Sequence, residues 1–243
     1  MTRYRDRLPQ LSGESFLTPA GTETDLIFTH GTNILDFAAH TLSLEVAGRE
    51  AMSRHLRHFL SLALETQARS TLDSQTWQAP MHCADDPVAT EDELRHSNQN
   101  SVEFIAGLRD EFEKNTKPIV LNGLIGPRGD AYAPEVEVSA QEAEEYHAKQ
   151  IGWLAGTDID MVTALTFTQS DEAIGVVRAA NKVGLPIAVS FTVETDGNLP
   201  TQQPLNEAID AVDKATGAGA AYFMVNCAHP DHFQTFSRTT SGR

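Results

Sequence analysis

The second half of the chain alternates strand-length apolar runs with amphipathic helical patterns, and this alternation limits the fold more than any other feature. The pattern predicts strands at residues 160–165, 185–193 and 221–225, and helices at 139–155, 170–183 and 204–216. Gly184 and Gly217 follow two of these helices, as glycine commonly does at a helix end. Such an alternation predicts parallel strands joined by right-handed helical crossovers.

The first half repeats this pattern less regularly. Its strand candidates are residues 15–18, 69–73 and 117–123, and its helical patterns cover about 33–67, with a break near Gly48, and 90–114. Thr90 is followed three residues later by Glu93, which is the spacing of a capping box at a helix start. The whole chain therefore contains six strand–helix starts, the last without its helix.

Two architectures fit this order, an open doubly wound sheet and a (β/α)8 barrel. No strand is followed by Gly-x-Gly-x-x-Gly, and no Lys-Ser or Lys-Thr pair follows Gly126-Pro-Arg-Gly129, so neither nucleotide-binding loop is indicated. A complete barrel takes about 250 residues in eight units, roughly 30 per unit. The expected fold class is therefore α/β, a (β/α)8 TIM-barrel type that is incomplete, with about six of eight strand–helix units present.

Charge and cysteine content exclude several classes of protein. The chain has 18 basic and 34 acidic residues and a net charge of −16, which argues against nucleic-acid and membrane partners. Its two cysteines, Cys83 and Cys227, lie far apart and suggest no disulfide framework. The charged start lacks the apolar stretch of a signal peptide, and no run reaches transmembrane length. A cytoplasmic protein is expected.

The last apolar run ends in Asn226 and Cys227. In a barrel this end of a strand is where active-site residues lie, so the thiol is a candidate metal ligand or nucleophile. A local alternative is a zinc site made by Cys227, His229 and His232, which lie within six residues. Pro230 stands between the two histidines, and no helical pattern fixes their spacing.

Five short segments, each at the carboxyl end of a predicted strand, together resemble one family. They are Leu17-Thr-Pro-Ala-Gly-Thr-Glu-Thr24, Thr76-Trp-Gln-Ala79, Gly123-Leu-Ile-Gly-Pro-Arg-Gly129, Ser190-Phe-Thr-Val-Glu-Thr-Asp-Gly197 and Val225-Asn-Cys227. In this order they resemble the homocysteine S-methyltransferases, over Phe16 to Phe233. The resemblance implies a barrel domain at residues 1–233, a disordered or non-native tail at 234–243, and a chain that stops before the seventh and eighth strands.

The resemblance also implies a reaction and a cofactor. Family members move a methyl group from a small donor to the thiol of homocysteine, giving methionine. They hold a zinc ion that lowers the pKa of the substrate thiol, so that its sulfur can attack the methyl carbon. No cobalamin or folate domain fits in this length, which favours S-methylmethionine or S-adenosylmethionine as donor.

The family's site residues carry over only in part. Cys227 matches one of three zinc-binding cysteines, and the other two have no counterpart. Gly21, Thr22 and Glu23 would line the amino-acid end of the substrate, and Asn226 would shape the metal loop. Two acidic residues of the family are lost, because Asp-Gly-Gly reads Pro19-Ala20-Gly21 and Phe-Glu-Thr reads Ala164-Leu165-Thr166. Glu194 is a candidate replacement, and no residue is assigned a catalytic role.

Two hypotheses about function follow. The first is a zinc-dependent methyltransferase that acts on homocysteine. The second is a catalytically inactive barrel fragment or pseudoenzyme that lacks the complete zinc site. In either case the unpaired edges of an incomplete barrel favour self-association.

Overall fold

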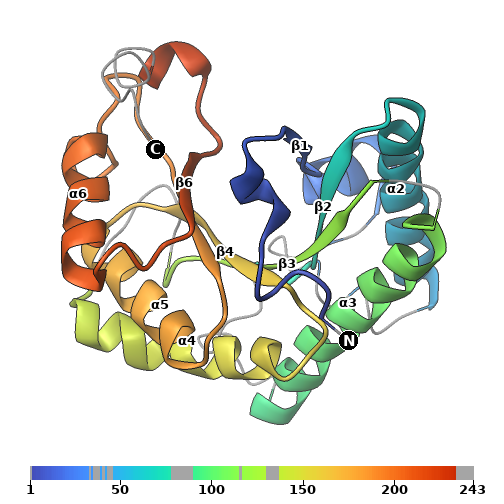
Figure 1. Cartoon of the computed structure of the whole chain (residues 1–243), viewed down its shortest axis with the longest axis horizontal. Helices are drawn as coiled ribbons and strands as arrows, with labels where there is room; N and C mark the ends of the chain where they lie inside the picture. Colours follow the sequence, from blue (N-terminus) through green and yellow to red (C-terminus); the bar gives the residue numbers. More distant parts are fainter. Residues whose placement is uncertain are drawn as a thin grey trace. The chain divides into compact units, whose positions relative to one another are not determined.

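A computed structural model describes residues 2–32, 34, 39, 42, 46–77, 90–114, 117–129 and 137–233 (Figure 1). The chain divides into two compact units. The first unit comprises Met1–Leu124 and Trp153–Met161, and the second comprises Ile125–Gly152 and Val162–Arg243. The tail predicted at residues 234–243 lies outside the described residues.

Three parallel strands form the sheet of the first unit in chain order. They are β1 (Phe16–Leu17), β2 (Arg69–Asp73) and β3 (Ile119–Ile125). In their register Phe16 is opposite Arg69, and Asp73 is opposite Asn122. The helices of this unit are η1 (Pro9–Ser12), α1 (Thr22–Thr24), η2 (Asp25–Thr29), α2 (Val46–Glu65) and α3 (Glu91–Phe112).

The second unit repeats this arrangement with β4 (Met161–Phe167), β5 (Ile187–Phe191) and β6 (Tyr222–Val225). Its helices are α4 (Ala140–Ala155), α5 (Ser170–Lys182), α6 (Leu205–Thr216) and η6 (Pro230–Phe233). The strands are again parallel and in chain order. All residues of β5 are buried, as expected for the middle strand of three, whereas those of β6 are only half-buried.

Most predicted elements agree with the observed ones. The exception is the helix predicted over about residues 33–67 with a break near Gly48: α2 begins at Val46 and continues through Gly48 without a break, and most of residues 33–45 lie outside the described part of the chain. The strand predicted at residues 69–73 is β2. The capping box at the start of α3 is present, with the Thr90 hydroxyl accepting from the Glu93 amide and the Glu93 carboxylate accepting from the Thr90 amide. Gly217, with φ of 66°, ends α6. The prediction for β3 began and ended two residues early, since the buried run continues to Ile125.

A buried ion pair ties the N-terminal segment to the first unit. The Asp160 side chain is 0% exposed, and its Oδ2 accepts from Arg109 Nη1 at 2.7 Å. Asp160 also accepts from three backbone amides, those of Arg3 at 2.8 Å, Tyr4 at 3.0 Å and Leu121 at 2.9 Å. A buried carboxylate is tolerated only with such partners, so these contacts fix residues 3–4 beside α3 and β3.

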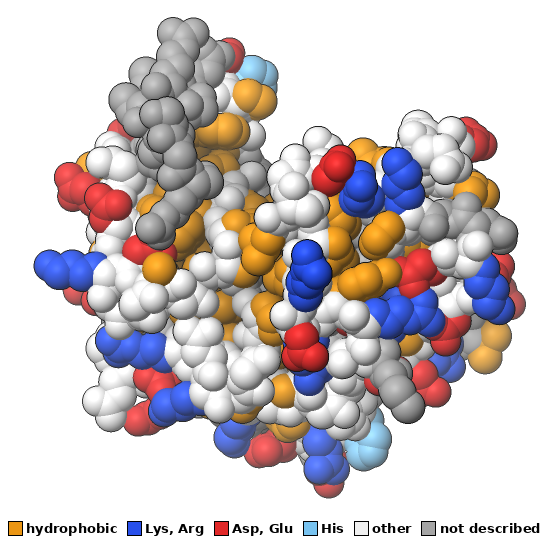
Figure 2. All heavy atoms as spheres, in the orientation of Figure 1, with side chains coloured by type: hydrophobic (Ala, Val, Ile, Leu, Met, Phe, Trp, Pro, Cys, Tyr) orange, Lys and Arg blue, Asp and Glu red, His pale blue; other side chains and the backbone are white. Residues whose placement is uncertain are grey.

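The surface shows no segregation of charge on the face that Figure 2 displays. Acidic and basic side chains are interspersed there. None of the described helices is long and apolar enough to cross a membrane.

Candidate functional site

A buried carboxylate lies at the carboxyl ends of β1 and β2, opposite the middle of β3. Asp73 is the last residue of β2 and is 6% exposed. Its Oδ1 accepts from Nδ2 of Asn122, in the neighbouring β3, at 2.9 Å. Its Oδ2 lies 3.4 Å from the hydroxyl of Thr18, which follows β1. The carboxyl ends of β1 and β2 and the middle of β3 thus meet at this side chain.

The Asp73 carboxyl group is a weaker acid than usual because burial removes it from water. Burial raises its pKa to about 6 from the ordinary 3.8, although the hydrogen bonds from Asn122 and Thr18 act in the opposite direction. The charge of Glu23 raises it further. The pKa of Glu23 is itself raised, mainly by desolvation. Two carboxylates in a water-poor region attract a cation, and perturbed acids of this kind are common in binding sites.

The segment predicted for the amino-acid end of the substrate contributes one of these two acids. Gly21 follows β1 with φ of 61°, a left-handed conformation that glycine adopts without strain, and precedes α1. Thr22 is buried, and Glu23 is half-buried and lies within electrostatic reach of Asp73. Sequence reasoning missed Asp73. The available signal was an acid at the carboxyl end of a predicted strand.

In the second unit, Asn226 joins the ends of three strands. Its Oδ1 accepts from the Thr166 amide at 3.1 Å and from the Ser190 hydroxyl at 2.7 Å. Its Nδ2 donates to the Thr166 hydroxyl at 2.8 Å and to Cys227 Sγ at 3.3 Å. The amide group is therefore fully used within the protein, so Asn226 shapes the loop rather than offering free groups to a ligand.

Asn226 also supports an unusual backbone conformation. Thr166 has φ of 65°, which is rare for a β-branched residue, and lies where the register of β4 shifts. Its amide and its hydroxyl both bond to the Asn226 side chain. Strained residues of this kind persist where the surrounding structure holds them, and they occur often near functional sites.

Cys227 does not have the neighbours that a zinc site needs. It is exposed and has φ of 54°. Within the described residues no three His, Cys, Asp or Glu side chains lie together as metal ligands. Cys83 falls outside the described residues. The residues that the structure describes therefore do not fit the three-thiolate zinc site that the resemblance implies.

The alternative site of Cys227, His229 and His232 is wrong, since the structure does not bring these three described residues together as a metal-binding group. The two imidazole rings lie 5.9 Å apart. His229 Nδ1 accepts instead from the backbone amide of Asp231 at 3.2 Å. These contacts belong to the short helix η6, which turns the chain after β6.

Glu194 lies in a tight turn after β5 with its side chain exposed. Its backbone carbonyl accepts from the Gly197 amide at 3.0 Å, and its amide donates to the Asn198 carbonyl at 2.8 Å. Gly197 has φ of 85°, and a Cβ there would lie 2.7 Å from the carbonyl oxygen of His232. The turn thus requires glycine, and the role predicted for Glu194 stays a prediction.

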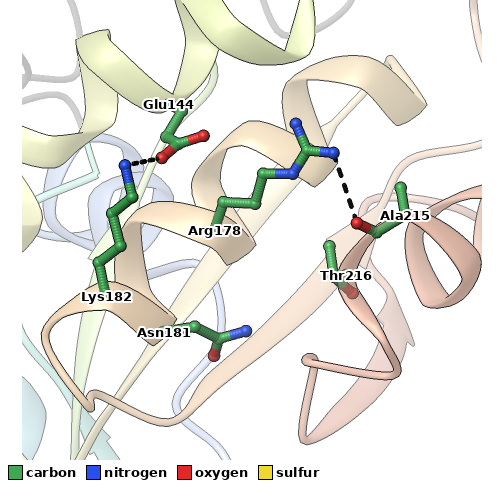
Figure 3. Close-up of a pocket in the computed structure, with 6 residues that line it drawn as sticks. All are labelled: Glu144, Arg178, Asn181, Lys182, Ala215 and Thr216. Atoms are coloured by element: carbon green, nitrogen blue, oxygen red, sulfur yellow. Dashed lines mark hydrogen bonds and ion pairs between the residues drawn. The ribbon is translucent and has the colours of Figure 1, made fainter.

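A shallow hollow between α4, α5 and α6 is a separate feature of the second unit (Figure 3). It is lined by Glu144, Arg178, Asn181, Lys182, Ala215 and Thr216. Glu144 forms an ion pair with Lys182, and Arg178 donates to the Ala215 carbonyl at 3.4 Å. The ends of α5 and α6 precede β5 and β6, so the hollow lies toward the amino ends of these strands. Barrel active sites lie at the opposite ends.

Comparisons with known proteins give a family and a fold. A family model described as homocysteine S-methyltransferase matches residues 56–242, more than half of the chain. The metallated form of the homocysteine methyltransferase MmuM from Escherichia coli has a TM-score of 0.77 at 15% identity, covering 96% of this chain and 83% of that one. The oxidized form gives 0.76 at 16% identity, with 98% and 83% covered. A comparison with the curated proteins gives no significant match.

These solved structures confirm the predicted fold class, an incomplete (β/α)8 barrel type with six strand–helix units in the described part of the chain.

Proposed function

Because the chain belongs to the homocysteine S-methyltransferase family, we propose that it transfers a methyl group to the thiol of homocysteine and so forms methionine. The observation that carries this proposal is the family match over residues 56–242. The likeness in fold to a homocysteine methyltransferase supports it.

The substrate's ammonium group would bind at Asp73 and Glu23. Homocysteine carries an ammonium and a carboxylate at one end and a thiol at the other. The family's acidic residue after the first strand is absent here, and Asp73 supplies a carboxylate at the end of the next strand. An ammonium ion beside it would favour its ionised form and restore the charge balance of a buried site. Asn122 and Thr18 orient this carboxylate.

The proposed chemical step is a direct methyl transfer. The thiol loses its proton to solvent, and the electron pair of the sulfur forms a bond to the methyl carbon. At the same time the bond between that carbon and the sulfur of a sulfonium donor breaks, and the donor leaves as a neutral thioether. S-methylmethionine and S-adenosylmethionine are both donors of this class. Asn226 and Cys227 lie in the loop that follows β6.

Zinc enters this proposal only as the family's cofactor. When bound, zinc would lower the pKa of the substrate thiol. The described residues offer it a single cysteine, Cys227, and no group of three ligands. The roles proposed for Asp73 and Glu23 do not depend on the metal.

A turnover assay with zinc analysis tests the function. The purified protein is mixed with homocysteine and a donor that carries a deuterated methyl group, and labelled methionine is measured by mass spectrometry. Metal content is measured on the same preparation, with a Cys227→Ser variant beside it. Labelled methionine that depends on protein and thiol supports the proposal. A folded protein that binds homocysteine without forming methionine would instead support the inactive barrel.

Two further expectations accompany the function. The net charge of −16 supports small-molecule partners over nucleic acid and anionic membranes, and a cytoplasmic location is part of this proposal. Self-association is also proposed, through the half-buried strand β6.

A further inference from the structure

A buried histidine–glutamate pair joins α4 to α5 in the second unit. Nε2 of His147 lies 3.0 Å from Oε1 of Glu172, and the two side chains are 0% and 1% exposed. A carboxylate oxygen can only accept, so Nε2 of His147 carries the proton in this contact. Burying a charged or polar group is costly unless it is paired, so this pair needs a structural or functional reason.

The same carboxylate oxygen also holds the turn that follows β3. The backbone amide of Arg128 donates to Glu172 Oε1 at 2.5 Å. The guanidinium of Arg128 lies over the ring of Tyr146, 5.4 Å from its centroid. The backbone of Arg128 is thus fixed from α5 and its side chain from α4. The turn Gly126–Gly129 stands at the carboxyl end of β3, where barrel enzymes carry their site loops.

Two aromatic rings and two polar atoms without a described partner complete the pair's surroundings. His147 packs against the rings of Tyr146, at 4.9 Å, and Phe167, at 5.6 Å. Within the described residues, Nδ1 of His147 and Oε2 of Glu172 are buried without a hydrogen-bond partner. The polar contacts of the two side chains in the described chain converge on one oxygen and lead to the turn.

We propose that Glu172 is a positioning residue whose carboxylate, oriented by His147, holds the turn Gly126–Gly129 at the carboxyl end of β3. The turn is one of the segments that carry the family resemblance. The effect of this contact on catalysis rests on the proposed function. Its effect on the turn itself does not, so the two can be tested apart.

A second ion pair between the same helices provides a matched control. Glu144 in α4 pairs with Lys182 in α5 at the hollow shown in Figure 3. The residues that line this hollow, in the described part of the chain, come from α4, α5 and α6 and not from the turn. A Glu144→Ala variant therefore removes an α4–α5 ion pair while leaving the Arg128 amide held.

Hydrogen exchange of the turn is the direct test. Peptides that cover residues 123–129 are followed by mass spectrometry in the wild type and in Glu172→Gln, Glu172→Ala, His147→Phe and Glu144→Ala variants. Removing a charged hydrogen-bond acceptor is expected to speed exchange of the Arg128 amide by about 10- to 100-fold. Glu172→Gln keeps an acceptor oxygen and should show a smaller increase in exchange rate than Glu172→Ala. The increase in His147→Phe should lie between those of these two variants. Glu144→Ala should match the wild type.

The pattern across variants decides the question. Faster exchange confined to the turn, in the order given, supports the proposal. The proposal is overturned if the Arg128 amide stays protected in folded Glu172→Ala. It is also overturned if Glu172→Gln and Glu172→Ala speed exchange equally throughout α4, α5 and β4, which is the result that a general packing role predicts. With an active wild type, the KM for homocysteine should rise at least fivefold in Glu172→Ala while kcat changes less than twofold. An inactive wild type removes only this kinetic readout.

Discussion

At the scale of single residues, Asp73 shows how a binding role and stability can oppose each other. Its pKa is raised to about 6 by burial, so the folded protein favours the protonated carboxyl group more than the unfolded chain does. The folded state therefore holds an extra proton between about pH 4 and pH 6, and stability falls as the pH rises through this range. A site kept for a cation is then a source of instability when that cation is absent.

We expect Asp73→Asn to stabilise the free protein at pH 7.5 and to weaken binding of homocysteine. The raised pKa corresponds to a cost of about 3 kcal/mol for the ionised carboxylate above pH 7, since each pKa unit is about 1.4 kcal/mol. Urea unfolding should show a gain of about 1–3 kcal/mol at pH 7.5 that is mostly lost at pH 4. Calorimetry should show binding of homocysteine weakened about tenfold, a loss of about 1.4 kcal/mol.

The exposed Asp92, paired with Arg95 at 2.8 Å, provides the control for this prediction. Asp92→Asn should change neither the stability nor the binding measurably. A destabilised Asp73→Asn at pH 7.5 would show that the carboxylate is needed for folding rather than for a ligand.

At the scale of helices and strands, what the sequence could predict depended on how local the signal was. The strand Arg69–Asp73 and the cap formed by Thr90 and Glu93 were both predicted correctly, and the cap is contained within four residues. Apart from Cys227, which adjoins Asn226, the partners described for Asp73, Asn226 and Asp160 lie 36 to 157 residues away, and no local pattern indicates such pairings. The hydrogen bonds of Asn226 and the His147–Glu172 pair could therefore be found only from the structure.

Asp160 gives a prediction at this scale. Asp160→Asn should lower the free energy of unfolding by about 3 kcal/mol or more, because it leaves the buried Arg109 without its carboxylate. The measurement is urea unfolding at pH 7.5. Asp110→Asn removes a surface contact to Arg3 and should cost less than about 1 kcal/mol. Equal costs for the two variants would contradict a dominant role for the buried pair.

At the scale of the whole molecule, the family and fold class could be predicted because five short segments occur in order, even though each is weak alone. The same comparison did not point to Asp73, because none of the five segments contains it. Charge also acts at this scale. A net charge of −16 opposes contact between copies, whereas β6 pairs only with β5 among the described strands and offers an edge to another strand.

We therefore expect self-association to increase with salt. Sedimentation velocity at pH 7.5 should show more dimer or larger species at 0.5 M than at 0.02 M NaCl, because salt screens the repulsion between negatively charged copies. Met224→Lys places a charge on β6 and should reduce the association at high salt. A monomer at both salt concentrations would exclude the edge as a contact between copies.

The bonds between Asp160 and the first residues of the chain have a consequence for biosynthesis. Asp160 is translated 157 and 156 residues after Arg3 and Tyr4, whose backbone amides it binds. At about 5–20 residues per second, that delay is roughly 8 to 30 s. During this time the N-terminal segment can contact Asp110 and Glu113 but not the buried carboxylate of Asp160. Translation past Asp160 therefore sets the earliest time at which the first unit can complete its buried contacts, however fast its other parts fold.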